Sequence, residues 1–254
     1  MSERLYADDT GEGGKALVLL HGFAGSHRVW DGVRSALPPG LRIIAHDLPG
    51  HGRSLSCPGA GKARASATAV LNDLDARGVN EFHLAGHSFG GAVAVLVACA
   101  APERVSSLTL FAPGGFGPEI AGDLLANRAA ADSRSALRAA LEGLFGPHAA
   151  LPPGVLEAAM ALDERPGQRE KLNEISNLIA GSGLQGVFPR AMLEGLSMPV
   201  HVVWGTRDVV LPVRQCDDLP DGFVLHRLDG LGHMLPEEAP QRMAAILRAV
   251  LGES

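Results

Sequence analysis

The stretch Gly86-His87-Ser88-Phe89-Gly90 joins an apolar run over residues 81–85 to a helical pattern over residues 90–101. A serine between two glycines, at the junction of a strand and a helix, matches the G-x-S-x-G turn. In that turn the serine takes a strained backbone conformation that lifts its hydroxyl clear of the sheet. A Cβ at position 86 or 90 would crowd the turn. The stretch therefore predicts Ser88 as a nucleophile at the end of a buried strand.

Further short apolar runs alternate with helical patterns along the chain, and each run ends abruptly at glycine, histidine or aspartate. This alternation indicates an α/β fold with a mostly parallel central sheet and helices on both faces. Most runs are apolar on both faces, which is typical of buried parallel strands. Strands are predicted at residues 16–20, 41–45, 81–85, 105–111, 200–204 and 223–228, and helices at about residues 66–77, 90–101 and 238–251.

The alternation stops after Phe111 and resumes at Pro199. Between about residues 117 and 197 the chain has amphipathic helical patterns rich in Ala, Leu, Glu and Arg. Breaks are predicted at Gly146-Pro147, Pro152-Pro153 and Pro166-Gly167. We interpret residues 117–197 as a helical cap insertion over the sheet, with an apolar inner side, and residues 1–116 and 198–254 as the core domain.

Composition excludes several classes of protein. The net charge of −6, without a basic cluster, disfavours a nucleic-acid partner. The longest apolar run, residues 92–101, is about half of the roughly 20 residues that span a bilayer, so no membrane partner is expected. The 3 cysteines are widely spaced, which argues against a disulfide framework. No secretory pattern is visible at the N-terminus, and we expect a cytoplasmic protein with a small-molecule substrate. The oligomeric state is not readable from the sequence.

A serine hydroxyl needs a base to act as a nucleophile, and the base needs an acid that orients it. In hydrolases with this turn the order along the chain is serine, acid, histidine. Asp208 follows the run that ends at Trp204, and His233 lies in the glycine-rich segment after the last predicted strand. Both are thus predicted at the carboxyl edge of the sheet, where sites of open α/β sheets form. Three other acids compete with Asp208, namely Asp217, Asp218 and Asp229, but Asp208 is preferred because it lies one tight turn beyond the strand.

An acyl-transfer site also needs donors for the oxyanion. One is expected from the N–H after the nucleophile, that of Phe89, and the other from Phe23 in the loop after the first predicted strand. His21 in that loop is predicted to brace it by hydrogen bonding. The histidines and aspartate between residues 46 and 54 fit no usual ligand spacing, so we expect no metal and no cofactor.

With these residues placed, the chain resembles the α/β-hydrolase fold family from about residue 14 to the C-terminus. The resemblance rests on His21-Gly22, the loop over residues 47–54, the Ser88 turn, Asp208 and the His233 loop, in family order. Residues 84–92 and 102–110 look like the hydrolase-like domain of acetyltransferase-component proteins of acetoin dehydrogenase complexes. They are also similar to carbon–carbon bond hydrolases and small carboxylesterases. Relatives that use aspartate at the turn, such as haloalkane dehalogenases, differ from this chain at Ser88.

The resemblance implies a serine hydrolase with a Ser88–His233–Asp208 triad, which cleaves a small or medium ester, thioester or related carbonyl substrate through an acyl-serine. Two other activities stay open: acyl transfer to a thiol acceptor, and hydrolysis of a carbon–carbon bond. Faster release of the acyl group with an added thiol distinguishes the transferase. A third hypothesis, a binding module without catalysis, predicts ligand stabilisation without turnover.

Overall fold

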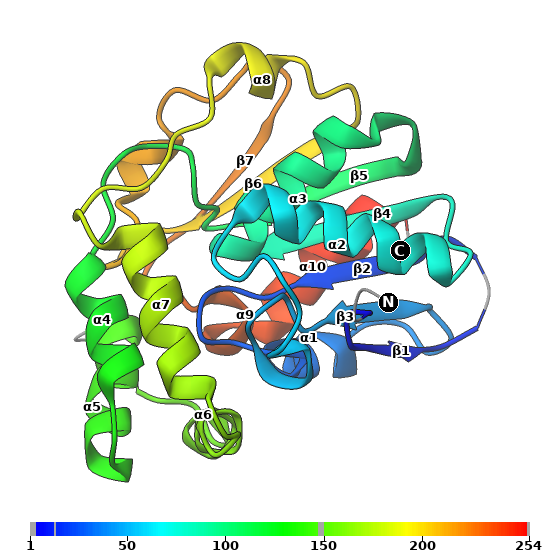
Figure 1. Ribbon diagram of the computed structural model, residues 1–254. Coiled ribbons are helices and arrows are strands. Elements are labelled where there is room, and N and C mark those ends of the chain that lie inside the picture. Colours follow the sequence, from blue (N-terminus) through cyan, green and yellow to red (C-terminus); the bar gives the residue numbers. More distant parts are fainter. Residues whose placement is uncertain (1–3, 13, 147–149, 253–254) are drawn as a thin grey trace.

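The computed structural model describes residues 4–12, 14–146 and 150–252. Its centre is a seven-stranded sheet with strand order β1-β3-β2-β4-β5-β6-β7, which confirms the predicted α/β fold class (Figure 1). Six strands run parallel, and β1 pairs antiparallel with β3. The strands are β1 (Ala7–Thr10), β2 (Ala16–Leu20), β3 (Ile43–His46), β4 (Phe82–His87), β5 (Val105–Phe111), β6 (Val200–Gly205) and β7 (Val224–Leu228).

The sequence analysis missed β1, whose residues are Ala-Asp-Asp-Thr. This edge strand lacks an apolar run because its acids find cations on neighbouring segments. Asp9 accepts hydrogen bonds from Arg42 Nε (3.1 Å) and Arg42 Nη2 (3.0 Å), and a third from Arg77 Nη1 (3.0 Å). A polar strand held by ion pairs leaves no periodic signal in the sequence.

Helices cover both faces of the sheet (Figure 1). α2 (Ala63–Ala76) and α3 (Phe89–Ala100) pack together on one face, and α1 (Asp31–Ser35) packs with α9 (Leu235–Glu238) and α10 (Pro240–Leu251) on the other. The helix predicted at residues 238–251 is α10, which begins at Pro240, and the short α9 directly before it was not predicted. Short 3-10 turns complete the core at η1 (His27–Trp30), η2 (Gly52–Ser54), η3 (Pro102–Arg104) and η4 (Val213–Cys216).

The remaining helices lie between β5 and β6 in the sequence: α4 (Gly122–Ala130), α5 (Arg134–Phe145), α6 (Val155–Asp163), α7 (Gln168–Ala180) and α8 (Arg190–Glu194). α4 to α7 gather at the lower left of Figure 1, whereas α8 lies at the top. The predicted breaks fall between helices: α5 ends before Gly146, α6 begins after Pro152-Pro153, and Gly167 lies between α6 and α7, while Pro147 lies outside the described residues. Buried Arg128 of α4 donates two hydrogen bonds to Asp163 of α6 (2.9 and 3.0 Å). In the described part of the chain, no helix combines the length and apolarity that crossing a bilayer requires.

Two neighbouring strands bring distant loops together at the carboxyl edge of the sheet. β2 pairs with β4 so that Leu20 lies opposite Gly86. The loop after β2 and the Ser88 turn after β4 therefore begin at the same height along the strand direction of the sheet. The contact leaves no room for side chains: a Cβ at Gly90 would lie 2.4 Å from the carbonyl oxygens of Leu20 and His21. A Cβ at Gly86 would lie 2.3 Å from the Gly90 carbonyl oxygen, as the crowding argument predicts.

Three buried histidines brace these loops in the neutral form. His21 Nε2 accepts from the Leu48 N–H (2.9 Å), so its Nδ1 donates to the Gly22 carbonyl oxygen (2.7 Å). His51 accepts from the Ala24 N–H (3.2 Å) and donates to the Pro49 carbonyl oxygen (3.2 Å), and His87 donates to the His233 carbonyl oxygen (2.9 Å). Burial lowers the pKa to about 4 for His21 and to about 3 for both His51 and His87.

These depressed pKa values predict an early loss of stability in acid. The unfolded chain protonates its histidines below about pH 6.5, whereas the folded chain keeps these three neutral, so their contribution is complete above pH 6.5 and falls as the pH drops toward 4. His51→Gln should lower the slope of unfolding free energy against pH by about one proton, roughly 1.4 kcal/mol per pH unit. Urea unfolding at a series of pH values between 4.5 and 8 measures this slope. An unchanged slope would contradict the neutral assignment of His51.

Candidate active site

Ser88 sits in a strained conformation directly after β4, with φ 53° and ψ −118°. Its N–H donates to the Phe111 carbonyl oxygen (3.0 Å), and its own carbonyl oxygen accepts from Gly91 and Gly114 (2.9 and 3.0 Å). These bonds hold a backbone conformation that non-glycine residues rarely adopt. Among the described non-glycine residues, the other two with positive φ are Ala24 and Ala112, in the loops after β2 and β5. Backbone strain is thus concentrated at the edge where the sequence predicts the chemistry.

The three predicted triad residues meet in the structure. The Ser88 hydroxyl lies 3.0 Å from His233 Nε2, and His233 Nδ1 lies 2.8 Å from Asp208 Oδ2. Because a carboxylate only accepts, Nδ1 carries the proton and Nε2 presents its lone pair to the Ser88 hydroxyl. The side chains of Asp208 and His233 are 0% and 4% exposed. Asp208 Oδ1 accepts from the N–H groups of Val210 and Leu211, both at 2.8 Å, which fixes the carboxylate.

His233 follows the edge strand β7 and must cross β6 to reach Ser88. Its loop does so over Gly205, the last residue of β6, where a Cβ would lie 2.3 Å from the carbonyl oxygens of Leu231 and Gly232. The Arg207 N–H donates to the Leu231 carbonyl oxygen (2.9 Å) and ties the crossing loop to the segment that carries Asp208. The glycine at 205 therefore permits the contact between His233 and Ser88.

The competing acids have other partners. Asp217 contacts Arg227, Asp218 accepts from Arg190 (2.8 Å), and Asp229 accepts from the Thr206 hydroxyl (3.1 Å). Of the four candidate acids, Asp208 is the one that the structure brings to His233.

The predicted oxyanion donors flank the nucleophile. Phe89 is the first residue of α3, so its N–H has no acceptor within that helix. Phe23 reaches the site through Gly22, where an added Cβ would come within 3.1 Å of Ser88 Cβ. Both Phe23 and Phe89 line the same cavity as Ser88.

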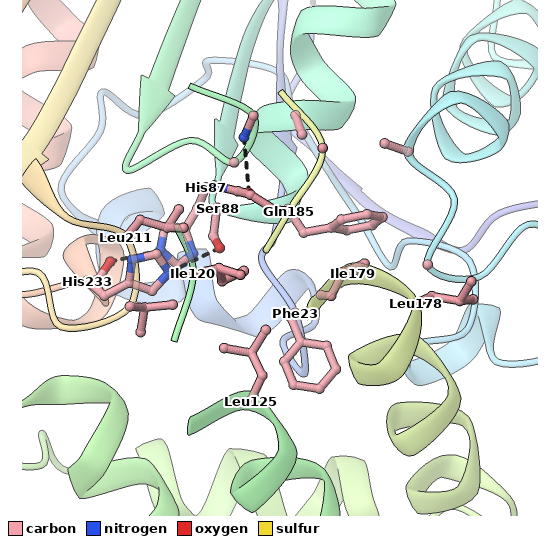
Figure 2. Close-up of a pocket in the computed structure, with 18 of the residues that line it drawn as sticks. Phe23, His87, Ser88, Ile120, Leu125, Leu178, Ile179, Gln185, Leu211 and His233 are labelled. Carbon is pink, nitrogen blue, oxygen red and sulfur yellow. Dashed lines mark hydrogen bonds between the residues drawn. The ribbon is translucent and has the colours of Figure 1, made fainter. Parts of the chain in front are cut away.

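This nucleophile cavity, as we call it, has a volume of about 310 Å³. Figure 2 shows Ser88 pointing toward His233, while Ile120, Leu125 and Phe23 extend along the cavity on the other side. Gln185 closes part of the wall, because its Oε1 accepts from the Gly115 N–H (3.1 Å) and its Nε2 donates to the Gly117 carbonyl oxygen (2.9 Å). Within the described residues the ionisable side chains of the lining are His87 and His233, and the wall is otherwise mainly apolar.

Sequence reasoning missed Glu238, which holds the His233 loop. Its carboxylate accepts from the N–H groups on both sides of the histidine, Gly232 (2.7 Å) and Met234 (2.8 Å). Burial raises the pKa of Glu238, although the two N–H bonds oppose that shift. An acid at a predicted helix start was visible in the sequence, but such residues commonly serve only the helix terminus.

Known proteins resemble the chain in sequence and in structure. The model of the "Alpha/beta hydrolase family" matches residues 17–246. The "Dihydrolipoyllysine-residue acetyltransferase component of acetoin cleaving system" of Pseudomonas putida is 38% identical over 94% of this chain, and the chain covers 65% of that relative's length. A "2-hydroxy-6-oxononadienedioate/2-hydroxy-6-oxononatrienedioate hydrolase" of Burkholderia vietnamiensis is 40% identical over 45% of this chain and 42% of its own.

Among solved structures, the 2-hydroxy-6-oxo-6-phenylhexa-2,4-dienoate hydrolase of Rhodococcus sp. strain RHA1 superposes with a TM-score of 0.82 at 23% identity. The match covers 98% of this chain and 94% of that one, and it shows a shared fold. The family match spans the sheet, the Ser88 turn and the His233 loop. The chain therefore belongs to the alpha/beta hydrolase family.

Proposed function

We propose that this chain is a serine hydrolase that cleaves esters with an uncharged, apolar acyl group. The observation that carries the proposal is the continuous path of short contacts from the Ser88 hydroxyl through His233 to Asp208. A strained serine, a buried histidine and the backbone N–H groups of Phe23 and Phe89 beside one cavity are the parts that acyl transfer needs.

In the first half of the proposed reaction, Ser88 Oγ attacks the carbonyl carbon while His233 Nε2 takes the hydroxyl proton. Asp208 stabilises the imidazolium, and the N–H groups of Phe23 and Phe89 bind the oxyanion. The tetrahedral intermediate collapses, the bond to the leaving oxygen breaks, and His233 gives that oxygen the proton. Water then repeats the sequence on the acyl-serine, which releases the acid and restores the Ser88 hydroxyl.

We also propose that residues 117–197 act as a cap on the core formed by residues 1–116 and 198–254. Leu125 of α4, Leu144 of α5 and Ile179 of α7 all line the nucleophile cavity. Three helices from this region thus supply apolar wall to the same space as Ser88. Substitutions in these helices change the shape of the acyl pocket and leave the reacting groups in place.

Acyl transfer to a thiol is the second candidate, because the relative from Pseudomonas putida is named as an acetyltransferase component. It uses the same acyl-serine and differs in the acceptor that enters after the first half-reaction. The chain covers 65% of that relative's length, so the role of the whole relative extends to this chain only as a proposal.

Ser88→Ala should abolish covalent labelling by a fluorophosphonate probe and should lower kcat for p-nitrophenyl butyrate by at least about 1,000-fold, because no other hydroxyl replaces the attacking group. Mass spectrometry of the intact protein measures the labelling, and initial rates give kcat. Unchanged labelling, or ester turnover that survives the substitution, would refute the assignment of Ser88.

Glu238→Ala should lower kcat by about 10- to 100-fold with little change in KM, because the two N–H groups beside His233 lose their acceptor and the imidazole shifts relative to Ser88. The kcat of Glu238→Gln should lie between those of wild type and Glu238→Ala, since the amide oxygen can accept from one of the two N–H groups. Glu103→Ala, at an exposed residue of η3, is the matched control and should keep the wild-type rate. Equal kcat in Glu238→Ala and wild type would show that the Glu238 carboxylate does not position His233.

The lining of the nucleophile cavity predicts discrimination against charged acyl groups. The relative from Burkholderia vietnamiensis is named for a dioate, yet the described lining here contains no lysine or arginine to pair with a carboxylate. We expect kcat/KM for p-nitrophenyl butyrate to exceed that for mono-p-nitrophenyl succinate at least tenfold. Comparable values, or faster cleavage of a carbon–carbon bond in a dienedioate, would favour the carbon–carbon hydrolase instead.

A further inference from the structure

A second cavity of about 470 Å³ lies beside the nucleophile cavity, between α5 and α6 on one side and α1, α9 and the start of α10 on the other. The two cavities share Phe23, Leu144 and Met234 in their walls. Phe23 carries a proposed oxyanion donor, and Met234 directly follows His233 in the chain. The second cavity therefore lies next to the loop that carries Phe23 and to the His233 loop. We call it the Glu237 cavity.

The two cavities differ in chemistry. The nucleophile cavity has no carboxylate or guanidinium in its described lining, whereas the Glu237 cavity is lined by Arg28, Asp31, Arg128, Glu157 and Glu237. Several of these charges already have partners. Arg128 is paired with Asp163 (2.9 Å), Glu157 with Arg134 (2.9 Å), and Asp31 lies 3.5 Å from Arg34. A charged ligand would thus gain little from them.

Of the remaining two charged residues, Arg28 is exposed to solvent, whereas Glu237 has a buried side-chain oxygen. Its Oε2 is buried and has no hydrogen-bond partner among the described residues, while the residue as a whole is partly exposed and lines the cavity. Burial, together with the charge of Glu238, raises the pKa of Glu237 to about 8 against the opposing charge of Arg128. At neutral pH this side chain is mainly a carboxylic acid, which both donates and accepts hydrogen bonds. An unsatisfied buried carboxyl oxygen is costly, and a rotation of the Glu237 side chain toward the cavity would bring its carboxyl group to a hydroxyl partner there.

The two arms of an ester diverge from its carbonyl carbon. The acyl arm fits the apolar nucleophile cavity, and the leaving oxygen must come close to His233 Nε2 to receive its proton. The leaving arm then continues past Phe23 and Met234 into the Glu237 cavity. We propose that the Glu237 cavity binds the alcohol part of the substrate, and that this alcohol is uncharged and carries hydroxyl groups that bond to Glu237. The proposal rests on the serine hydrolase function proposed above.

Glycerol monobutyrate and propyl butyrate test the proposal, because they share an acyl group and a three-carbon alcohol and differ in two hydroxyls. Wild-type kcat/KM should favour the glycerol ester about three- to tenfold, the range expected for one or two hydrogen bonds between uncharged partners. Glu237→Leu should bring the ratio close to one, and Glu237→Gln should retain a preference for the glycerol ester. Glu142→Leu, on the exposed face of α5 and outside both cavities, should keep the wild-type ratio.

A second measurement needs no variant. By microscopic reversibility, an alcohol that binds in the Glu237 cavity should intercept the acyl-serine, so added glycerol should yield more butyrate ester than the same concentration of 1-propanol. Equal capture of the two alcohols, a wild-type ratio near one, or an unchanged ratio in Glu237→Leu would each overturn the assignment. Those results would leave the proposed function intact if Ser88→Ala abolishes turnover of both esters. Turnover that survives Ser88→Ala would refute the function itself.

Discussion

The close backbone contact between the end of β2 and the Ser88 turn is the constraint on which the rest of the structure depends. Gly90 rests against the carbonyl oxygens of Leu20 and His21, at a distance that no side chain permits. This contact sets the level at which Ser88 leaves the sheet and brings the Phe23 loop beside it. A similar approach of Gly205 to the Leu231 and Gly232 carbonyls brings His233 across β6. Close backbone packing therefore positions the loops that carry the site.

Polar groups then fix the loops that this packing brings together. Neutral histidines at 21, 51 and 87 satisfy backbone groups in the loops after β2 and β3 and in the His233 loop. Imidazole suits this position because one ring nitrogen donates while the other accepts. The Glu238 carboxylate adds two bonds around His233. These bonds fix the loops that hold Ser88 and His233 at a distance of 3.0 Å.

The cavities on either side of Phe23 give the site two chemical environments. One is apolar and includes Ser88, and the other contains ionisable groups of which Glu237 alone has a buried oxygen without a described partner. Residues of α4, α5 and α7 line the first, and residues of α4, α5 and α6 line the second. The helices between β5 and β6 thus contribute to both walls. Under the proposed function, these helices would set the selectivity and the carboxyl edge of the sheet would supply the reacting groups.

The sequence by itself determined the features that local chemistry and chain order express. Ser88 was visible because a glycine-flanked serine at a strand–helix junction is a local pattern, and Asp208 and His233 because they follow later strands in the expected order. Only the tertiary structure decided that β1 joins the sheet, that the acids competing with Asp208 have other partners, and that Glu238 holds the His233 loop. The distinction between Glu237 and Glu238 is the clearest case. Both residues lie in the single turn of α9 and point in different directions: Glu238 contacts the His233 loop, and Glu237 lines a cavity.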